Sequence, residues 1–239
     1  MKDLIVANWK MNPSSFKEAK KLFDSVKKTK SKNAEVVICP PFLYLPLLKG
    51  ATLGAQDVFW EEKGAFTGEI SATQLKDLKV EYVIIGHSER RRYFGETNEA
   101  INKKLKKVLE TGLKPIFCVG ENESEDKAMV LEQQLTQSLM GISRDNAKHI
   151  TIAYEPVWAI GTGKNCSTDE TMKSVLFTRK IVSQLYNREI ADSVRILYGG
   201  SVNGKNAADY LKNAGIQGLL VGGASLNPEE FSLLVKSAG

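Results

Sequence analysis

The sequence predicts one α/β domain, a (β/α)8 barrel of eight parallel strands ringed by helices. Eight short apolar runs recur along the 239 residues, with little polar alternation, as in a parallel sheet covered on both faces. Helical patterns separate these runs, and eight strand–helix units are close to the lower limit for such a barrel. The length alone would also allow two domains, but no linker of biased composition divides residues 1–239.

Four strands are predicted in the first half of the chain, each from a short apolar run. They cover residues 4–7, 36–39, 52–56 and 82–86. A helix is expected from about Ser15, because five apolar residues recur there at helical spacing. These are Phe16, Ala19, Leu22, Phe23 and Val26. A connection without a regular pattern, residues 57–69, then leads to a short helix that Ser71 and Gln74 open in capping-box form.

Four more strands are predicted in the second half of the chain. They cover residues 115–119, 149–154, 194–198 and 218–221. Ahead of them, a helix from about Thr97 is expected to bury Ala100, Ile101, Leu105, Val108 and Leu109. The helix after the sixth strand begins where Ser167 and Glu170 have capping-box spacing, and it runs to about Tyr186. The last helix starts near Pro228, a favourable first-turn residue.

The charge pattern does not indicate a nucleic-acid-binding protein. The net charge is +5 and the isoelectric point is about 8.9, so the chain is only mildly basic. Two Lys-rich patches stand out, at residues 27–30 and 103–107, and both are expected on solvated helical surfaces. We therefore expect no nucleic-acid partner.

Cysteine usage and the N-terminal sequence favour a cytoplasmic protein. Cys39, Cys118 and Cys166 are odd in number and widely spaced, which suits free thiols in a reducing compartment. The first apolar run is too short for a signal peptide, and no window approaches the length of a membrane span. We expect no membrane association.

Residues 154–164, Tyr-Glu-Pro-Val-Trp-Ala-Ile-Gly-Thr-Gly-Lys, carry the clearest functional signal. The sixth strand ends on a lone carboxylate, Glu155, and Pro156 fixes the direction in which the chain leaves it. The apolar residues 157–160 then lead to the glycines at 161 and 163. Such a loop suits a lid that closes over a ligand and excludes water, with Pro156 and residues 161–163 as its hinges. A plain strand-to-helix connection explains neither the carboxylate nor Trp158.

Other polar residues follow other strands and converge with Glu155, because ligands of such barrels bind at the C-terminal ends of the strands. Asn8 and Lys10 follow the first strand, and His87 follows the fourth. A substrate-facing cation is favoured for Lys10 over an ordinary surface lysine. A catalytic role is favoured for His87 over that of a hydrogen-bonded core histidine. The second histidine, His149, begins a strand at the opposite face.

Glycine pairs at 199–200 and 222–223 follow the last two strands, where such barrels often build a phosphate site. Glycine lets backbone N–H groups approach an anion closely, although plain turns would use the same residues. Two histidines and three dispersed cysteines form no metal-ligand cluster, so no metal is expected. No Gly-x-Gly-x-x-Gly motif follows the first strand, so no dinucleotide cofactor is expected. A carboxylate, an imidazole, an ammonium and an anion cradle suit cofactor-free proton transfer beside the carbonyl of a small phosphorylated substrate.

Five stretches resemble the motifs of the triosephosphate isomerase family, in the family's order and across nearly the whole chain. They are residues 8–12, 86–91, 154–164, 198–202 and 220–226. The resemblance implies a TIM barrel that interconverts dihydroxyacetone phosphate and D-glyceraldehyde 3-phosphate through a cis-enediolate, in glycolysis and gluconeogenesis. Ala7 and Gln217 depart from the pattern, since a glycine and an acidic residue are usual there, but neither has a catalytic role.

The resemblance also implies roles for individual residues. Glu155 would be the base, His87 the electrophile, and Lys10 the cation beside the developing oxyanion, with Asn8 lining the same pocket. The residues implied in substrate binding are Asn8, Lys10, Gly161, Ser201, Gly222 and Gly223.

A homodimer is implied as well, with the loop around Ala65–Glu69 entering the partner subunit near its active site. A tetramer is the alternative assembly.

Two rival interpretations of the function remain: another phosphate-binding barrel isomerase or lyase, and a barrel that binds partners at a surface. The first would not explain the lid motif. Retention of Lys10, His87 and Glu155 argues against a purely non-catalytic protein, although a second, surface-binding role stays open.

Overall fold

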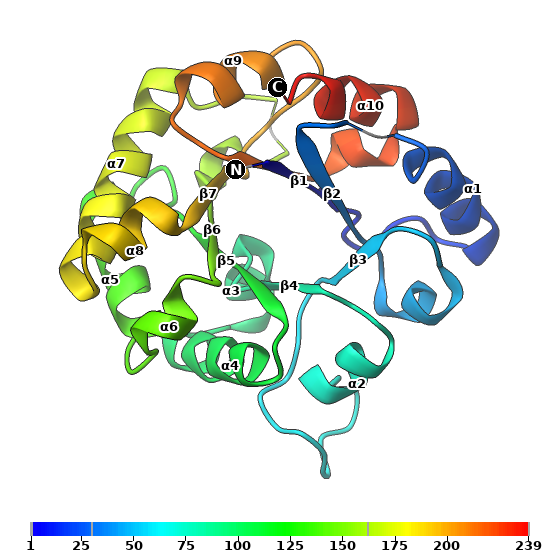
Figure 1. Cartoon of the computed structure of the whole chain (residues 1–239), viewed down its shortest axis with the longest axis horizontal. Coiled ribbons are helices and arrows are strands. Elements are labelled where there is room, and N and C mark those ends of the chain that lie inside the picture. The colour runs from blue at the N-terminus through cyan, green and yellow to red at the C-terminus, as the bar shows by residue number, and fades with distance from the viewer. Residues whose placement is uncertain (1, 30, 162, 239) are drawn as a thin grey trace.

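The computed structural model describes residues 2–29, 31–161 and 163–238, and within them eight parallel strands form a closed barrel (Figure 1). Neighbours in sequence pair with one another, and β8 pairs with β1 to close the ring. The strands are β1 (Asp3–Asn8), β2 (Ala34–Cys39), β3 (Thr52–Ala55), β4 (Tyr82–Ile85), β5 (Lys114–Val119), β6 (Thr151–Tyr154), β7 (Arg195–Tyr198) and β8 (Gly218–Val221). The predicted fold class is therefore confirmed.

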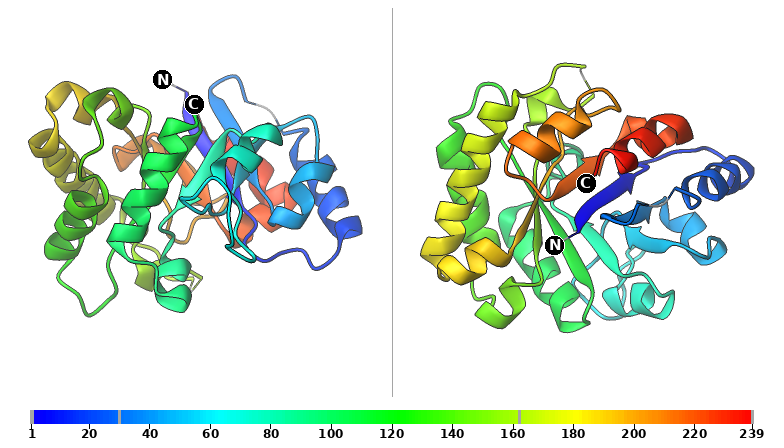
Figure 2. Two further views of the ribbon diagram at one scale, coloured as in Figure 1. Left: turned by 90° about the horizontal axis from the view of Figure 1, so that it is seen from below. Right: turned by 45° about the horizontal axis from the view of Figure 1, so that its top comes forward.

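Helices surround the strands in every view (Figures 1 and 2). The α-helices are α1 (Phe16–Val26), α2 (Ala72–Asp77), α3 (Ser88–Phe94), α4 (Asn98–Glu110), α5 (Lys127–Ser138), α6 (Arg144–Ala147), α7 (Thr168–Leu185), α8 (Arg188–Ser193), α9 (Ala207–Asn213) and α10 (Pro228–Lys236). Three 3-10 segments are η1 (Phe42–Leu47), η2 (Val157–Ala159) and η3 (Gly223–Leu226). Among the described residues, no helix is both long enough and apolar enough to cross a bilayer.

The strands lack polar alternation because both of their faces are buried. Along β1, Leu4 and Val6 belong to the cluster that fills the barrel, whereas Ile5 and Ala7 pack in the layer between strands and helices. Successive side chains of a strand point to opposite faces, so an apolar residue is needed at every position. All four of these side chains are fully buried.

The helix starts follow the capping residues of the sequence, with one partial exception. At α2, Ser71 Oγ accepts the Gln74 N–H and Gln74 Oε1 accepts the Ser71 N–H, so the predicted box is complete. At α7, Ser167 Oγ accepts the Glu170 N–H at 3.2 Å, but the Glu170 carboxylate instead accepts from Lys127 at 3.1 Å. The predicted N-cap at Ser167 is therefore confirmed, but the predicted return bond from the Glu170 side chain to the Ser167 backbone is not formed.

One lysine of the Lys-rich patch at residues 103–107 does not lie on a solvated surface as predicted, whereas the other lysines of the patch are exposed or half-buried. Lys104 is only 3% exposed, because it shares a face of α4 with Ile101 and Val108. Its Nζ lies 2.7 and 2.9 Å from the two carboxylate oxygens of Asp57, and it also contacts Glu96. Three predicted core positions are more open than expected: Phe16 is 42% exposed, and Leu22 and Ala100 are half-buried.

Replacing Lys104 with Met should lower the free energy of unfolding by about 3–5 kcal/mol, because it leaves the Asp57 and Glu96 carboxylates buried without this cation. Urea unfolding at one protein concentration measures the change. Lys103→Met is the matched control, since the half-exposed Lys103 pairs with Glu99 across one helical turn, lies 5.6 Å from the centre of the Trp60 ring, and should cost about 1 kcal/mol or less. Equal, small losses in both variants would contradict a structural role for the buried cation.

Candidate active site

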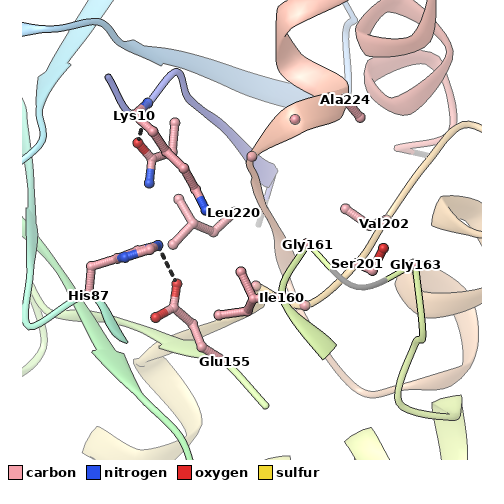
Figure 3. A pocket seen from close by; sticks show the side chains of 15 residues that line it. Lys10, His87, Glu155, Ile160, Gly161, Gly163, Ser201, Val202, Leu220 and Ala224 are labelled. Atoms are coloured by element: carbon pink, nitrogen blue, oxygen red, sulfur yellow. Dashed lines mark hydrogen bonds and ion pairs between the residues drawn. The ribbon is translucent and has the colours of Figure 1, made fainter. Parts of the chain in front are cut away.

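A cavity of about 200 Å³ opens where the C-terminal ends of the strands meet (Figure 3). Its size favours a small ligand, since pockets for drug-sized molecules measure roughly 300–1,000 Å³. The sequence-predicted site residues all line it, although they come from distant parts of the chain. They are Asn8, Lys10, His87, Glu155, Gly161, Ser201, Gly222 and Gly223.

Glu155 directly follows β6 and is almost completely buried, with 2% exposure. Its Oε1 lies 3.1 Å from His87 Nε2, and its Oε2 accepts the backbone N–H of Ser88 at 3.1 Å. Burial acts to raise the pKa of Glu155, but His87 and the Ser88 N–H outweigh it and hold the pKa below its usual value. Oε1 has no well-directed hydrogen-bond donor among the described residues, so this oxygen is available to accept a proton.

The loop after β7 approaches the Glu155 side chain very closely. A β-carbon at Gly199 would lie 2.8 Å from Glu155 Cγ, closer than such atoms pack. Any other residue at this position would push the carboxylate away from His87. The glycine after β7 therefore positions the carboxylate in addition to forming a wall of the cavity.

His87 is the N-cap of α3, and this fixes the state of its ring. Its Nδ1 accepts the backbone N–H of Glu89 at 3.2 Å, so Nδ1 carries no proton and the neutral ring has its proton on Nε2. Burial lowers the pKa of His87, but the Glu155 carboxylate outweighs it and raises the pKa above its usual value. The increase in the pKa of His87 depends on its contact with Glu155, whereas the hydrogen bond to Nδ1 comes from the backbone of α3 and does not depend on Glu155. The neutral imidazole is therefore favoured once the carboxylate turns away from the ring.

Lys10 is held in an unusual backbone conformation, with φ at 54° in the left-handed region. Its N–H donates to Asn8 Oδ1 at 3.1 Å, and its carbonyl accepts from Gln56 Nε2 at 2.8 Å. The Nζ lies 2.5 Å from Glu89 Oε1, and the side chain points into the cavity (Figure 3). Sequence reasoning missed Gln56, although its place at the end of the third strand was a usable signal.

The first part of the lid is anchored by Glu121, which sequence reasoning also missed. Its Oε1 accepts from Tyr154 Oη at 3.0 Å and from Trp158 Nε1 at 3.3 Å, and its backbone carbonyl accepts from Val157. Beyond η2, Ile160, Gly161 and Gly163 reach the cavity, whereas Thr162 of the predicted hinge lies outside the described residues. The predicted lid thus lines the pocket that Glu155 enters.

The pKa of Glu155 can be measured by carboxyl ¹³C NMR, with its signal identified by its loss in Glu155→Gln. A lowered pKa keeps the group ionised as pH falls, so we expect its midpoint below the ordinary value of 4.5 and an ionised carboxylate at neutral pH. A midpoint above 4.5 would show that burial outweighs His87 and Ser88.

The chain matches the model of the family described as Triosephosphate isomerase over residues 3–238. It is 47% identical over 245 residues to the triosephosphate isomerase of Dictyoglomus thermophilum, and the match covers 98% of each chain. The triosephosphate isomerase of Carboxydothermus hydrogenoformans is 46% identical over 250 residues, with 99% of each chain covered. That of Alkaliphilus oremlandii is 46% identical over 241 residues, or 96% of this chain and 97% of the relative.

These matches set aside a different phosphate-binding barrel isomerase or lyase, because they extend over the whole barrel and include the lid. The chain belongs to the triosephosphate isomerase family.

Proposed function

We propose that this cavity interconverts dihydroxyacetone phosphate and D-glyceraldehyde 3-phosphate through an enediolate, without a cofactor, as a step of glycolysis and gluconeogenesis. One observation carries the assignment to these residues. A buried, ionised carboxylate faces an imidazole and an ammonium in a cavity whose opposite wall consists of glycine backbone. This is the set of groups that proton transfer beside a carbonyl of a small phosphate ester requires.

Glu155 acts as the base in this proposal. It removes a proton from the carbon next to the substrate carbonyl and returns it to the neighbouring carbon. The lowered pKa keeps the carboxylate ionised near neutral pH, and Oε1 leaves its 3.1 Å contact with His87 Nε2 when it turns to the substrate carbon. A general base must lie within hydrogen-bonding reach of the carbon-bound proton, and the position of Glu155 on the cavity wall allows this.

His87 and Lys10 stabilise the negative charge that develops on the carbonyl oxygen. The Nε2–H of His87 is its only ring proton, since Nδ1 accepts from Glu89, so this N–H serves the substrate oxygen when Glu155 turns to carbon. The Lys10 ammonium, which also lines the cavity, adds positive charge, and Asn8 holds the Lys10 backbone. Donors held in place before reaction need no reorganisation as charge develops.

The phosphate group occupies the glycine-rich wall. Gly161, Ser201, Gly222 and Gly223 surround that part of the cavity, and their backbone N–H groups are the donors we assign to the phosphate oxygens. A β-carbon at Gly223 would meet nothing within 4 Å, so a ligand can approach this backbone.

A coupled assay for triose phosphate interconversion tests the function, and Glu155→Gln tests the base. The variant keeps the size of the side chain and removes its basicity, so kcat should fall by roughly 100- to 10,000-fold. Affinity for phosphoglycolate should change far less, because the glycine wall is untouched. Glu123→Gln, at an exposed loop position, is the control and should retain full turnover. Substantial turnover by Glu155→Gln would refute the assignment.

A homodimer is the assembly we propose, from two features of the surface. Large apolar side chains next to the active site are exposed: Met11 by 92%, Leu43 by 79% and Phe94 by 70%. Met11 and Phe94 also line a second cavity that shares Lys10 and His87 with the active site. The loop between β3 and α2 projects from the barrel in Figure 1, and the second cavity is where the partner's loop would enter.

Charging the tip of that loop should separate the subunits. In Phe66→Asp with Thr67→Glu, the loop would carry two unpaired carboxylates into an apolar interface, at a cost of several kcal/mol. Sedimentation should then show monomers, and turnover should fall because the Lys10 and His87 side of the pocket loses its cover. Glu61→Asp with Glu62→Asp, exposed positions of the same loop, keeps its charge and should leave the dimer intact. An unchanged oligomer with full turnover would place the interface elsewhere.

We also propose that residues 1–239 act as one domain and that the protein works in the cytoplasm. The family's pathway and three free, buried cysteines (Cys39, Cys118 and Cys166) support a reducing compartment.

A further inference from the structure

Arg91 is a half-buried cation of α3 that none of the roles above uses. Its Nε donates to the Gly86 carbonyl at 2.9 Å, and its Nη2 lies 3.4 Å from the Cys118 carbonyl. Its Nη1 donates to Asn98 Oδ1 at 2.6 Å. All three acceptors are neutral, and burial lowers the pKa of Arg91 from its ordinary value. Only the planar fork of a guanidinium lets one side chain reach three such acceptors at once.

The two backbone carbonyls belong to the ends of neighbouring strands. Strands β4 and β5 pair in register up to Ile85 and Phe117. Gly86 and Cys118 are the residues that follow this last pair. The guanidinium spans both of their carbonyls at the point where the pairing stops. Arg91 thereby ties the end of β4 to β5 at the mouth of the barrel.

The contact with Gly86 is transmitted to His87. The Gly86 carbonyl and the His87 N–H belong to one planar peptide unit, so a bond to this oxygen sets the plane from which His87 starts. Gly86 has a left-handed φ of 72°, and a β-carbon there would lie 2.8 Å from Ile101 Cδ1. Position 86 therefore needs glycine. Because glycine is conformationally permissive, the direction of its carbonyl depends on what holds that oxygen.

The contact with Cys118 leads in the same way to Glu155. Val119, the next residue of β5, accepts the Glu155 backbone N–H at 2.8 Å through its carbonyl. One guanidinium thus holds the backbones of both members of the proton-transfer pair, His87 through Gly86 and Glu155 through the end of β5. The 3.1 Å contact between Glu155 Oε1 and His87 Nε2 depends on this alignment.

We propose that Arg91 is a positioning residue for proton transfer, whose fork bridges the ends of β4 and β5 and thereby sets the spacing of His87 and Glu155. The phosphate-binding residues lie on other loops, after β6, β7 and β8. Loss of the bridge should therefore slow the chemical step and leave substrate binding unchanged. Proton transfer is sensitive to such a change, because a misplacement of about 1 Å can cost roughly 100-fold in rate. This inference rests on the proposed isomerase function.

Arg91→Lys tests the proposal, because it keeps the positive charge and replaces the planar fork with a single nitrogen. We expect kcat to fall roughly 10- to 100-fold, with KM and the inhibition constant of inorganic phosphate within about twofold of the wild type. Arg92→Lys is the matched control. Arg92 is exposed, and its guanidinium lies 5.2 Å from the centre of the Tyr93 ring. Its kcat should remain at the wild-type value.

NMR of the histidine rings provides a readout that does not depend on turnover. The ¹⁵N signal of His87 Nε2 reports the contact of this N–H with the Glu155 carboxylate. It should shift in Arg91→Lys and stay in place in Arg92→Lys. His149 precedes β6 at the other end of the barrel, so its signals should stay in place in both variants.

The inference is overturned if Arg91→Lys keeps the wild-type kcat, if its KM and phosphate inhibition change as much as its kcat, or if the His87 signal does not shift. Absence of turnover in the wild type would instead refute the proposed function, and the His87 signal would still test the positioning. If Arg91→Lys does not fold, Asn98→Ala removes one acceptor of the guanidinium at a half-buried position. It should lower kcat by a smaller factor, and an unchanged kcat would also overturn the proposal.

Discussion

The buried carboxylate of Glu155 is the constraint on which the rest of the site depends. An ionised carboxylate in an apolar interior is strongly unfavourable unless other groups compensate its charge. The compensating groups come from the end of β4, where His87 Nε2 and the Ser88 N–H meet the two carboxylate oxygens. After strand β7, Gly199 leaves room for the Glu155 side chain, because a β-carbon there would lie 2.8 Å from Glu155 Cγ. Only the closed order of the barrel brings the ends of β4, β6 and β7 to one point.

The two carboxylates of the site, Glu89 and Glu155, contact different partners. The Lys10 ammonium pairs with Glu89 at 2.5 Å, and Glu155 faces the imidazole of His87. If Lys10 paired with Glu155 instead, the base would be neutralised by the cation that the substrate oxygen needs. Glu89 also supplies the N–H that His87 Nδ1 accepts, which keeps the ring proton on Nε2. One residue of the first turn of α3 thus sets the ionic partner of Lys10 and the tautomer of His87.

The strands and most strand-end residues could be predicted because their signals are local. An apolar run marks a strand, and the barrel places whatever follows that run at the ligand-binding end. Lys104 could not be predicted, since its partner Asp57 is 47 residues away. The buried face of helix α5 includes a polar residue, Gln134, which bonds both the N–H and the carbonyl of Gly120. Glu121 was missed for the same reason as Lys104, because its partners become neighbours only after folding, whereas Gln56 had a local signal at the end of the third strand.

The two ends of the lid differ in how strongly they are held, and this difference determines where opening costs least. At the N-terminal end, Trp158 is half-buried and its bond to Glu121 is long, at 3.3 Å. At the C-terminal end, Cys166 is held at both its N–H and its carbonyl in a buried environment, where an unmade hydrogen bond is most costly. The half-buried bond of Trp158 can be exchanged for one to water more easily than the buried bonds of Cys166 can. Opening of the lid should therefore begin at Trp158 and end before Cys166.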